Sequence, residues 1–258
     1  MSRRFYSPHR SLWAALRCAA MDIREELHRD RTCRTIIVAL LLANAIFIAI
    51  HFLIGGLIYT GFGREAFPGL NYQNFALGAE GGYPEIFNYF QAATCTVLLV
   101  GIAVLTRQPA YLAWAVVFAF VLLDDALSVH EQFGAWLAET LALPAAFGMR
   151  TLDSGELLAW STVGAVLALI LLWGFRKSNS EARKFGSIFG VIFALLVFFG
   201  MGVDMLHIIL EGRSAVLDRA VEALEDGGEM LSIFLAVSVA LLLYRRLTRT
   251  APGGVQRA

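Results

Sequence analysis

The sequence predicts an all-α polytopic membrane protein with about six transmembrane helices, and three observations lead to this prediction. Hydrophobic residues make up 58% of the 258 residues, charged residues make up 16%, and the mean hydropathy is +0.64. A soluble domain is usually about a quarter charged. Several apolar stretches are long enough to cross about 30 Å of hydrocarbon. Lys and Arg are also distributed unevenly among the segments that join these stretches.

The apolar stretches divide the chain into three parts. A basic segment covers residues 1–34, a transmembrane domain covers 35–246, and a short tail covers 247–258. Asp124 and Asp125 interrupt the third span, and the sixth span begins with acidic residues, but both have apolar parts of full length. The predicted spans are 35–60, 85–106, 110–136, 154–175, 185–211 and 222–246.

The positions of Lys and Arg predict the orientation of the chain. The N-terminal segment, the turn RKSNSEARK at 176–184 and the tail YRRLTRT at 244–250 are rich in basic residues. The loops on the other side hold few of them, which are Arg64, Arg150, Arg213 and Arg219. Because cytoplasmic segments carry the excess of Lys and Arg, we expect both termini in the cytoplasm and the chain in a bacterial inner membrane.

The segment before the first span has the pattern of an amphipathic helix. In SLWAALRCAAMDIREELHR, apolar side chains fall on one helical face and Arg and Glu on the other. The apolar face contains Trp13, Leu16, Ala20, Ile23 and Leu27. This pattern predicts an interfacial helix on the inner membrane surface, or alternatively a solvated helix that packs on cytoplasmic loops.

Acidic and histidine side chains gather where four spans reach the same predicted side. They close the spans 110–136 and 185–211 and open the spans 154–175 and 222–246. Odd spans run outward and even spans run inward, so all four groups fall at the outer side. These residues are Asp124, Asp125, His130 and Glu131; Asp153 and Glu156; Asp204, His207 and Glu211; and Glu222, Glu225, Asp226 and Glu229.

The spacing within these groups predicts that they share one pocket. The pattern i, i+3, i+7 occurs twice, in Asp204, His207 and Glu211 and again in Glu222, Glu225 and Glu229. Each trio occupies about 60° of the helix circumference at about 100° per residue. Asp124 and Glu131 are also seven residues apart, so a continuous helix would place them on one face.

The excess of carboxylates in this predicted pocket must be neutralised. A charge at the centre of a membrane helix costs about 2.5–3.5 kcal/mol, and few Lys or Arg lie nearby to pair with it. Shared protons, water or bound cations would offset the charge. We predict one or two divalent metal ions, with iron or manganese favoured over zinc because carboxylates outnumber histidines. The predicted metal ligands are Asp124, His130, Glu131, Asp204, His207, Glu211, Glu222, Glu225 and Glu229.

Simpler roles stay open for several of these side chains. In each adjacent acidic pair, Asp124–Asp125 and Glu225–Asp226, one carboxylate is expected to face away from the pocket. His51 stands alone in the first span and is expected to be structural. Acids at a helix start also complement the helix dipole, which is an alternative role for Asp153, Glu156 and Glu222.

Two motifs in the sequence resemble motifs of a group of uncharacterised bacterial polytopic membrane proteins. Members of that group carry an HE pair on a middle span and an E-E-x-x-E-M run at the start of the last span. The present chain has His130-Glu131 in LDDALSVHE, and EDGGEM from Glu225 to Met230, with Asp226 in place of the second Glu. The resemblance covers the third to sixth spans. It implies the topology and the site positions but no reaction.

The sequence leaves three functions open. The first is a metal-dependent enzyme that acts on a lipid or another hydrophobic substrate at the outer side. The second is a non-catalytic subunit or assembly factor, with partner membrane subunits or a homo-oligomer, and the third is a proton or cation transporter. The formal net charge is zero and no basic stripe is present, which argues against nucleic-acid binding. Membrane lipids are the partners that the apolar spans predict.

Overall fold

The computed structural model describes residues 12–59, 74–145, 150–210 and 214–250, and this part of the chain is helical without a strand. Six helical stretches within it are long and apolar enough to cross a membrane, which confirms the predicted fold class. The elements are α1 (Leu12–Arg29), α2 (Arg31–Tyr59), α4 (Tyr83–Thr106), α5 (Pro109–Leu127), α6 (Val129–Thr140), α7 (Thr151–Lys177), α8 (Ser180–Val197), the π-helix η2 (Phe198–Val203), α9 (Asp204–Leu210) and α10 (Ala215–Thr250).

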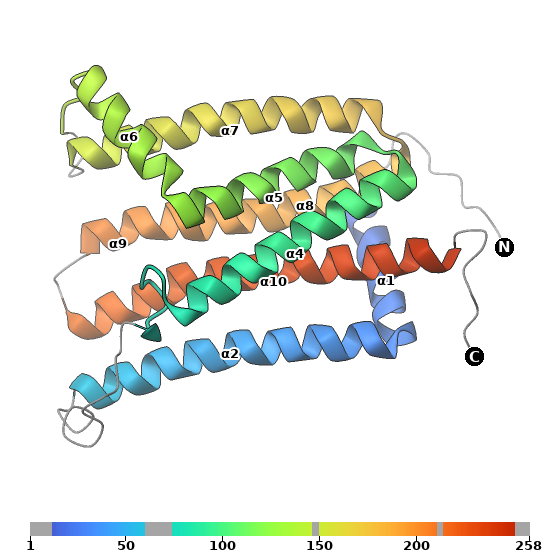
Figure 1. Cartoon of the computed structure of the whole chain (residues 1–258), viewed down its shortest axis with the longest axis horizontal. Helices are drawn as coiled ribbons and strands as arrows, with labels where there is room; N and C mark the ends of the chain where they lie inside the picture. The colour runs from blue at the N-terminus through green and yellow to red at the C-terminus, as the bar shows by residue number, and fades with distance from the viewer. Residues whose placement is uncertain (1–11, 60–73, 146–149, 211–213, 251–258) are drawn as a thin grey trace.

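Helix α10 is the centre of the bundle (Figure 1). It packs against α1, α2, α4, α8, η2 and α9. In its most apolar stretch 72% of the residues are buried, against 11% in α2 and 17% in α7, so these two helices lie at the periphery. The helix that carries the run EDGGEM is therefore surrounded by other helices.

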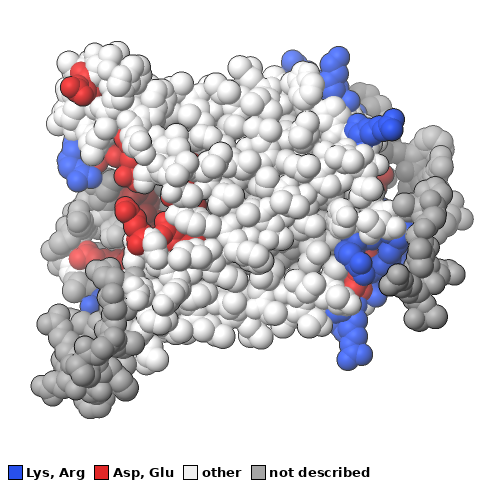
Figure 2. Space-filling model, in the orientation of Figure 1, with Lys and Arg blue, Asp and Glu red and all other residues white. Residues whose placement is uncertain are grey.

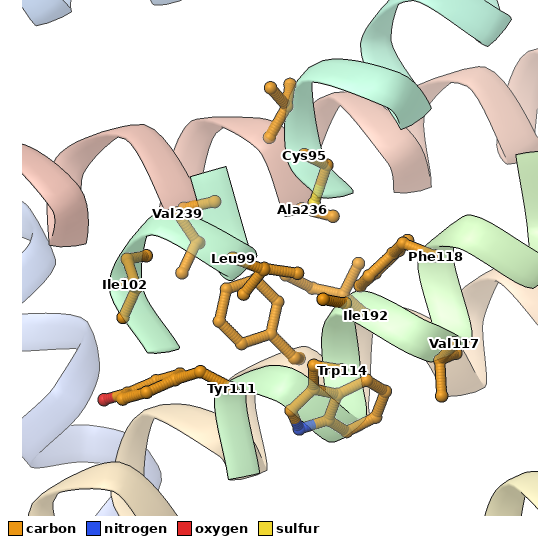
Figure 3. Packing of buried hydrophobic residues seen from close by; sticks show 14 of the residues in the cluster. Cys95, Leu99, Ile102, Tyr111, Trp114, Val117, Phe118, Ile192, Ala236 and Val239 are labelled. Carbon is orange, nitrogen blue, oxygen red and sulfur yellow. The ribbon is translucent and has the colours of Figure 1, made fainter. Parts of the chain in front are cut away.

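The apolar core joins α4, α5, α8 and α10 (Figure 3). Trp114 and Phe118 of α5 contact the ring of Phe189 in α8, with ring centroids 6.1 and 6.2 Å from Phe189. Leu99 of α4 and Ala236 of α10 are buried beside these rings. Large aromatic side chains fill this part of the membrane span and leave it tightly packed.

Two amides connect the peripheral α2 to the bundle. Asn44 Nδ2 donates to Gln91 Oε1 at 3.2 Å, and Gln91 Nε2 donates to Asn44 Oδ1 at 3.3 Å. Both side chains are buried, so this reciprocal pair satisfies polar groups that have no water to bind. Polar residues in these spans are thus paired across helices where they serve the fold.

The two ends of the bundle differ in charge (Figure 2). Lys and Arg gather at the end where α1, the α7–α8 turn and the last turns of α10 lie, which we call the basic end. Asp and Glu gather at the opposite, acidic end. Helix α1 and the C-terminal turns of α10 therefore lie at the same end of the bundle. The assignment of that end to the cytoplasm stays a prediction.

Helix α1 runs across the basic end and packs on α8, α10 and α2 (Figure 1). Its buried face contains Ala15 and Ala19, whereas Trp13 is 74% exposed. Ion pairs fix its C-terminal end to α10, since Glu26 contacts Arg249, and Asp30, the residue after the helix, contacts both Arg245 and Arg249. The helix therefore packs on the bundle and also keeps an exposed apolar side.

The third predicted span ends earlier than expected. The helix predicted over 110–136 stops at Leu127, because Ser128 adopts the left-handed conformation with φ 45° and ψ 46°. A separate helix, α6, begins at Val129 and packs on α7. The prediction that Asp124 and Glu131 share one face of a continuous helix is therefore wrong.

Candidate functional site

A polar cavity of about 480 Å³ lies at the acidic end of the bundle. It is lined by residues of α4, α5, α6, α7, η2, α9 and α10, and by the turns that precede α4 and α7. We call it the acidic pocket. The carboxylates that line it are Glu80, Glu85, Asp124, Asp125, Glu131, Glu156, Asp204, Glu225, Asp226 and Glu229. Among the other described lining residues, His130 and Arg150 are the ones that can carry positive charge.

The break at Ser128 brings His130 onto Asp124. The backbone N–H of His130 donates to Asp124 Oδ1 at 2.8 Å, and His130 Nδ1 lies 2.8 Å from Asp124 Oδ2. Asp124 is fully buried, while the imidazole lies against Trp160 of α7, with ring centroids 5.3 Å apart. Since Nδ1 is occupied by Asp124, Nε2 is the ring nitrogen left for chemistry in the pocket.

The surrounding acids also set the protonation of His130. Burial lowers its pKa, but the hydrogen bond to Asp124 and the charges of Asp124, Glu131 and Glu156 outweigh burial. They raise the pKa of His130 above its ordinary value. The ring therefore takes up a proton more readily than a histidine in water.

Close contact between two glycines holds α6 in this place. A Cβ added to Gly155 of α7 would lie 2.2 Å from the carbonyl oxygen of Gly134, and one added to Gly134 would lie 2.6 Å from the backbone N of Glu156. The two backbones therefore touch directly, as small residues allow in membrane helices. This contact sets His130 and Glu156 on neighbouring walls of the pocket.

The π-helix η2 makes room for the carboxylate of Glu229. A Cβ added to Gly200 would lie 2.1 Å from Glu229 Oε1, so a side chain at position 200 would collide with the carboxylate. Single π-helical turns often occur at functional sites, because they change the direction of nearby side chains. Here η2 also precedes Asp204, which begins α9 and lines the pocket.

Two further pairs lie beside the pocket. His207 Nδ1 of α9 is 2.9 Å from Glu225 Oε2 of α10. Glu222 Oε2 is 3.9 Å from His51 Nε2, and Glu222 Oε1 accepts the backbone N–H of Gly78 at 3.4 Å. His51 Nδ1 in turn accepts the N–H of Leu77 at 3.2 Å, so these contacts fix the turn before α4 to α2 and α10.

Two acids have partners that the fold requires, Glu85 in the wall of the pocket and Asp153 outside its lining. Asp153 is fully buried and accepts both the backbone N–H of Arg150 at 2.7 Å and its guanidinium Nη2 at 2.7 Å, which caps α7. Glu85 accepts the Tyr89 hydroxyl and the N–H of Gly81. Arg150 is thereby paired with Asp153, and most pocket carboxylates are left without a basic partner among the described residues.

Asn88 of α4 is a polar side chain in the wall of the acidic pocket that sequence reasoning missed. It is 7% exposed, and its Oδ1 is buried and accepts no hydrogen bond from the described part of the chain. A buried oxygen without a donor costs about 1–3 kcal/mol. A cation in the pocket would satisfy this oxygen, since Mg²⁺, Ca²⁺ and Mn²⁺ prefer oxygen ligands.

The predicted metal ligands are only partly brought together. Asp124, His130, Glu131, Asp204, Glu225 and Glu229 line the acidic pocket, whereas His207 and Glu222 are not among its lining residues. Glu211 lies outside the described residues. The expectation that one acid of each adjacent pair faces away is wrong, because Asp124, Asp125, Glu225 and Asp226 all line the pocket. The role of these residues as metal ligands stays a prediction.

The described part of the chain forms no ready-made coordination sphere. Among the described residues, no group of three or more His, Cys, Asp or Glu side chains is close enough to hold a metal ion. The donor set itself fits a divalent cation, since it combines carboxylates, one imidazole and the unsatisfied oxygen of Asn88. Binding would therefore require flexible side chains such as Glu229 to turn toward a common centre.

An apolar crevice of about 100 Å³ opens from the acidic pocket into the bundle. It shares with the pocket Asp125, His130, Glu156, Gly200, Asp204 and Glu229. The remaining walls come from α5, α7, α8, η2 and α9, and they are Val121, Leu157, Trp160, Phe193, Leu196, Val197, Met201 and Met205. We call this space the apolar crevice.

The chain belongs to the family described as Domain of unknown function (DUF8692), which matches residues 37–244. All lining residues of the acidic pocket and the apolar crevice fall within that range. No curated protein and no solved structure matches the chain.

Proposed function

We propose that this member of the family is an integral-membrane enzyme that binds a divalent cation in the acidic pocket and acts there on a hydrophobic substrate. The observation that carries the proposal is Asn88, whose buried Oδ1 lacks a donor in a pocket lined by carboxylates. The carboxylates around Asn88 repel one another, and the unsatisfied oxygen of Asn88 adds to the free-energy cost of the pocket. A cation relieves both, because it accepts oxygen ligands and neutralises negative charge.

The side chains of the pocket favour a hard cation. Carboxylates and the Asn88 amide supply oxygen, and His130 supplies one nitrogen, which suits manganese or iron(II) better than zinc. Asp204 and Glu229 approach from different helices and are the carboxylates that we expect to turn toward the cation. One or two ions fit the amount of charge that must be offset.

The chemistry of the site would combine the cation with one oriented histidine. A bound divalent cation polarises a carbonyl or phosphoryl oxygen or lowers the pKa of a bound water. Asp124 fixes the imidazole of His130 through Nδ1, and Nε2 of His130 then accepts or donates a proton in the pocket. Asp124 acts through His130 and is a positioning residue.

The packing of the core favours an enzyme over a transporter. Trp114, Phe118 and Phe189 are buried between the acidic pocket and the basic end. Ion passage needs polar groups or water along its route, and these rings supply neither. The acidic pocket thus resembles a site that is reached from one side of the membrane.

The test begins with cation binding by the full chain in detergent. After chelation and desalting, the melting temperature is measured with Mn²⁺, Fe²⁺, Mg²⁺, Ca²⁺ or Zn²⁺, and retained metal is counted by elemental analysis. We expect one or two Mn²⁺ or Fe²⁺ ions per chain and a higher melting temperature. In Asn88→Leu the metal-free protein should be as stable or more stable, while the stabilisation by metal shrinks.

Matched variants decide whether the pocket is responsible. Glu229→Gln should lower metal retention, whereas Glu139→Gln, an exposed residue of α6 outside the pocket, should not. The catalytic part is tested by incubating metal-loaded and metal-free protein in lipid vesicles and comparing lipids by mass spectrometry, with His130→Ala as the inactive control. No retained metal and no metal-dependent stabilisation would reject the proposal.

A further inference from the structure

The apolar crevice has the position and the apolar walls of a binding site for part of a hydrocarbon chain. It lies between α7 on one side and α8, η2 and α9 on the other, and all of these belong to predicted membrane spans. Helices α7 and α8 are joined by a short turn at the basic end and pack only sparsely on each other. The space between them near the acidic end is therefore left to the crevice.

The wall residues of the crevice extend along α8, η2 and α9 over a distance similar to one leaflet of a bilayer. Its walls reach from Phe193 to Met205 along α8, η2 and α9. Twelve residues at about 1.5 Å each give about 18 Å. Half of the hydrocarbon thickness of a bilayer is about 15 Å. The open volume of about 100 Å³ holds only a short part of a lipid chain, so a lipid that entered from the leaflet at the acidic end would place there the part of its chain next to the headgroup.

The lining of the crevice is also suited to a flexible apolar chain. Met201 and Met205 are adaptable side chains that adjust to irregular apolar ligands. At the rim, Leu157 of α7 is 38% exposed, so the crevice borders the surface that faces lipid. At its other end the crevice meets His130 and Asp204, which belong to the acidic pocket.

We propose that part of one hydrocarbon chain of a membrane lipid occupies the apolar crevice, with the polar head of that lipid in the acidic pocket. The placement of the head rests on the proposed function, whereas the placement of the chain rests on the crevice alone. The substrate is then a chain-bearing amphiphile that enters sideways from the leaflet, between α7 and α8–α9. A substrate without an apolar chain would leave the Phe, Leu and Met side chains of the crevice uncovered.

Photolabelling tests this placement in a bilayer. The full chain is reconstituted in phosphatidylethanolamine–phosphatidylglycerol vesicles in which part of the lipid carries a diazirine on one acyl chain, and adducts are mapped by peptide mass spectrometry. We expect adducts on Met201 and Met205 in addition to those on exposed lipid-facing residues. Leu169 of α7, which is exposed and outside the crevice, reports ordinary lipid contact in the same sample.

Two adjacent leucines of α8 provide a matched pair of variants. Leu196 lines the crevice, whereas Leu195 is exposed and does not. Leu196→Trp should abolish the adducts on Met201 and Met205 and leave the adduct on Leu169, and Leu195→Trp should preserve all three. Leu157→Trp fills the crevice from its exposed rim and gives the same expected loss without altering a buried position.

The outcomes separate this inference from the proposed function. Absence of adducts on Met201 and Met205 in the unaltered protein, or adducts that persist in both Leu196→Trp and Leu157→Trp, would overturn the inference even if metal is retained. Labelled methionines in a protein that retains no metal would instead remove the proposed function and leave the lipid chain in the crevice.

Discussion

The fully buried carboxylate of Asp124 contacts His130 twice, although the two residues lie on different helices. The contact exists because Ser128 ends α5 in the left-handed conformation and the chain turns before α6 begins. One carboxylate thus receives the backbone N–H of His130 and also fixes its ring. A buried acid that orients a histidine is a recurring arrangement in metal and catalytic sites.

Asp124→Asn should reverse the tautomer of His130. A carboxylate only accepts hydrogen bonds, so Asp124 keeps a proton on Nδ1 and leaves Nε2 with its lone pair. The amide of Asn can donate to Nδ1, which would move the proton to Nε2. Nitrogen-15 NMR of histidine-labelled protein should show this reversal, with the His130 signals assigned from His130→Gln. Asp125→Asn, which changes the neighbouring pocket acid, should keep the original tautomer, and an unchanged tautomer in Asp124→Asn would contradict the assignment.

Gly200→Ala should weaken cation binding without destabilising the metal-free protein. The added Cβ would meet only the carboxylate end of Glu229, which can rotate away at little cost. Changing a residue that orients a metal ligand typically lowers affinity about 10–100-fold. In Gly202→Ala the nearest atom would be 3.6 Å away in Phe198, so affinity should not change. Calorimetric titration with Mn²⁺ measures both variants, and equal affinities would show that Glu229 does not bind the cation.

Gly155→Ala should destabilise the protein, in contrast to Gly164→Ala on the same helix. At Gly155 the new Cβ would lie 2.2 Å from the backbone oxygen of Gly134, and backbone cannot rotate away. We expect a loss of about 1–3 kcal/mol, as for other overpacked sites. At Gly164 nothing lies within 4 Å of the added Cβ, so the gain in helix propensity of about 0.5–1 kcal/mol should appear. Unfolding in denaturing detergent compares the two, and equal stabilities would argue against the α6–α7 contact.

The sequence was sufficient to predict the number of spans and the end of the bundle at which the acidic groups lie, although the third span stops at Leu127. A membrane span needs about 20 apolar residues in a helix, because the backbone groups have no water to bind and must be hydrogen-bonded within the segment. Long apolar stretches in the sequence therefore identify the spans. The alternation of spans then places the acids of four segments at one end, as the pocket around Asp204 and Glu229 shows. These are properties of composition and length, which a single sequence carries.

The local devices that shape the pocket could not be predicted in this way. Ser128 is not a residue that usually adopts positive φ, and the apolar pattern continues past it into α6, so the break has no clear sequence signal. The π-helix at Gly200 likewise has no characteristic amino-acid composition by which the sequence would reveal it. Asn88 and Asn44 are both amides in apolar spans, but the side chain of Asn44 is paired with Gln91, whereas Oδ1 of Asn88 accepts no hydrogen bond from the described residues. Only the packing of neighbouring helices distinguishes them.

Asp30 should make the anchoring of α1 sensitive to acid. Its Oδ1 accepts the N–H of Cys33 at 3.0 Å as the cap of α2, and its Oδ2 accepts Arg245 Nε at 3.1 Å and a guanidinium N–H of Arg249. Burial alone raises the pKa of Asp30, but the Cys33 N–H, Arg245 and Arg249 outweigh it and hold the pKa well below its ordinary value.

A carboxylate with a depressed folded-state pKa stabilises the fold above its unfolded pKa of about 3.9, and this contribution is lost as the pH falls toward the folded value. Asp30→Asn should therefore lower the free energy of unfolding by about 1–2 kcal/mol at pH 7. This is the contribution of a charged hydrogen bond, reduced because solvent screens Arg245, which is 45% exposed. The difference from the unaltered protein should shrink at pH 3, where Asp30 of the unfolded chain is already mostly protonated while folded Asp30 keeps its charge, and melting curves in detergent at both pH values measure it. Glu25→Gln, an exposed acid of α1, should change stability at neither pH. A cost of Asp30→Asn that stays constant from pH 7 to pH 3 would mean that the charge of Asp30 does not hold α1 to α10.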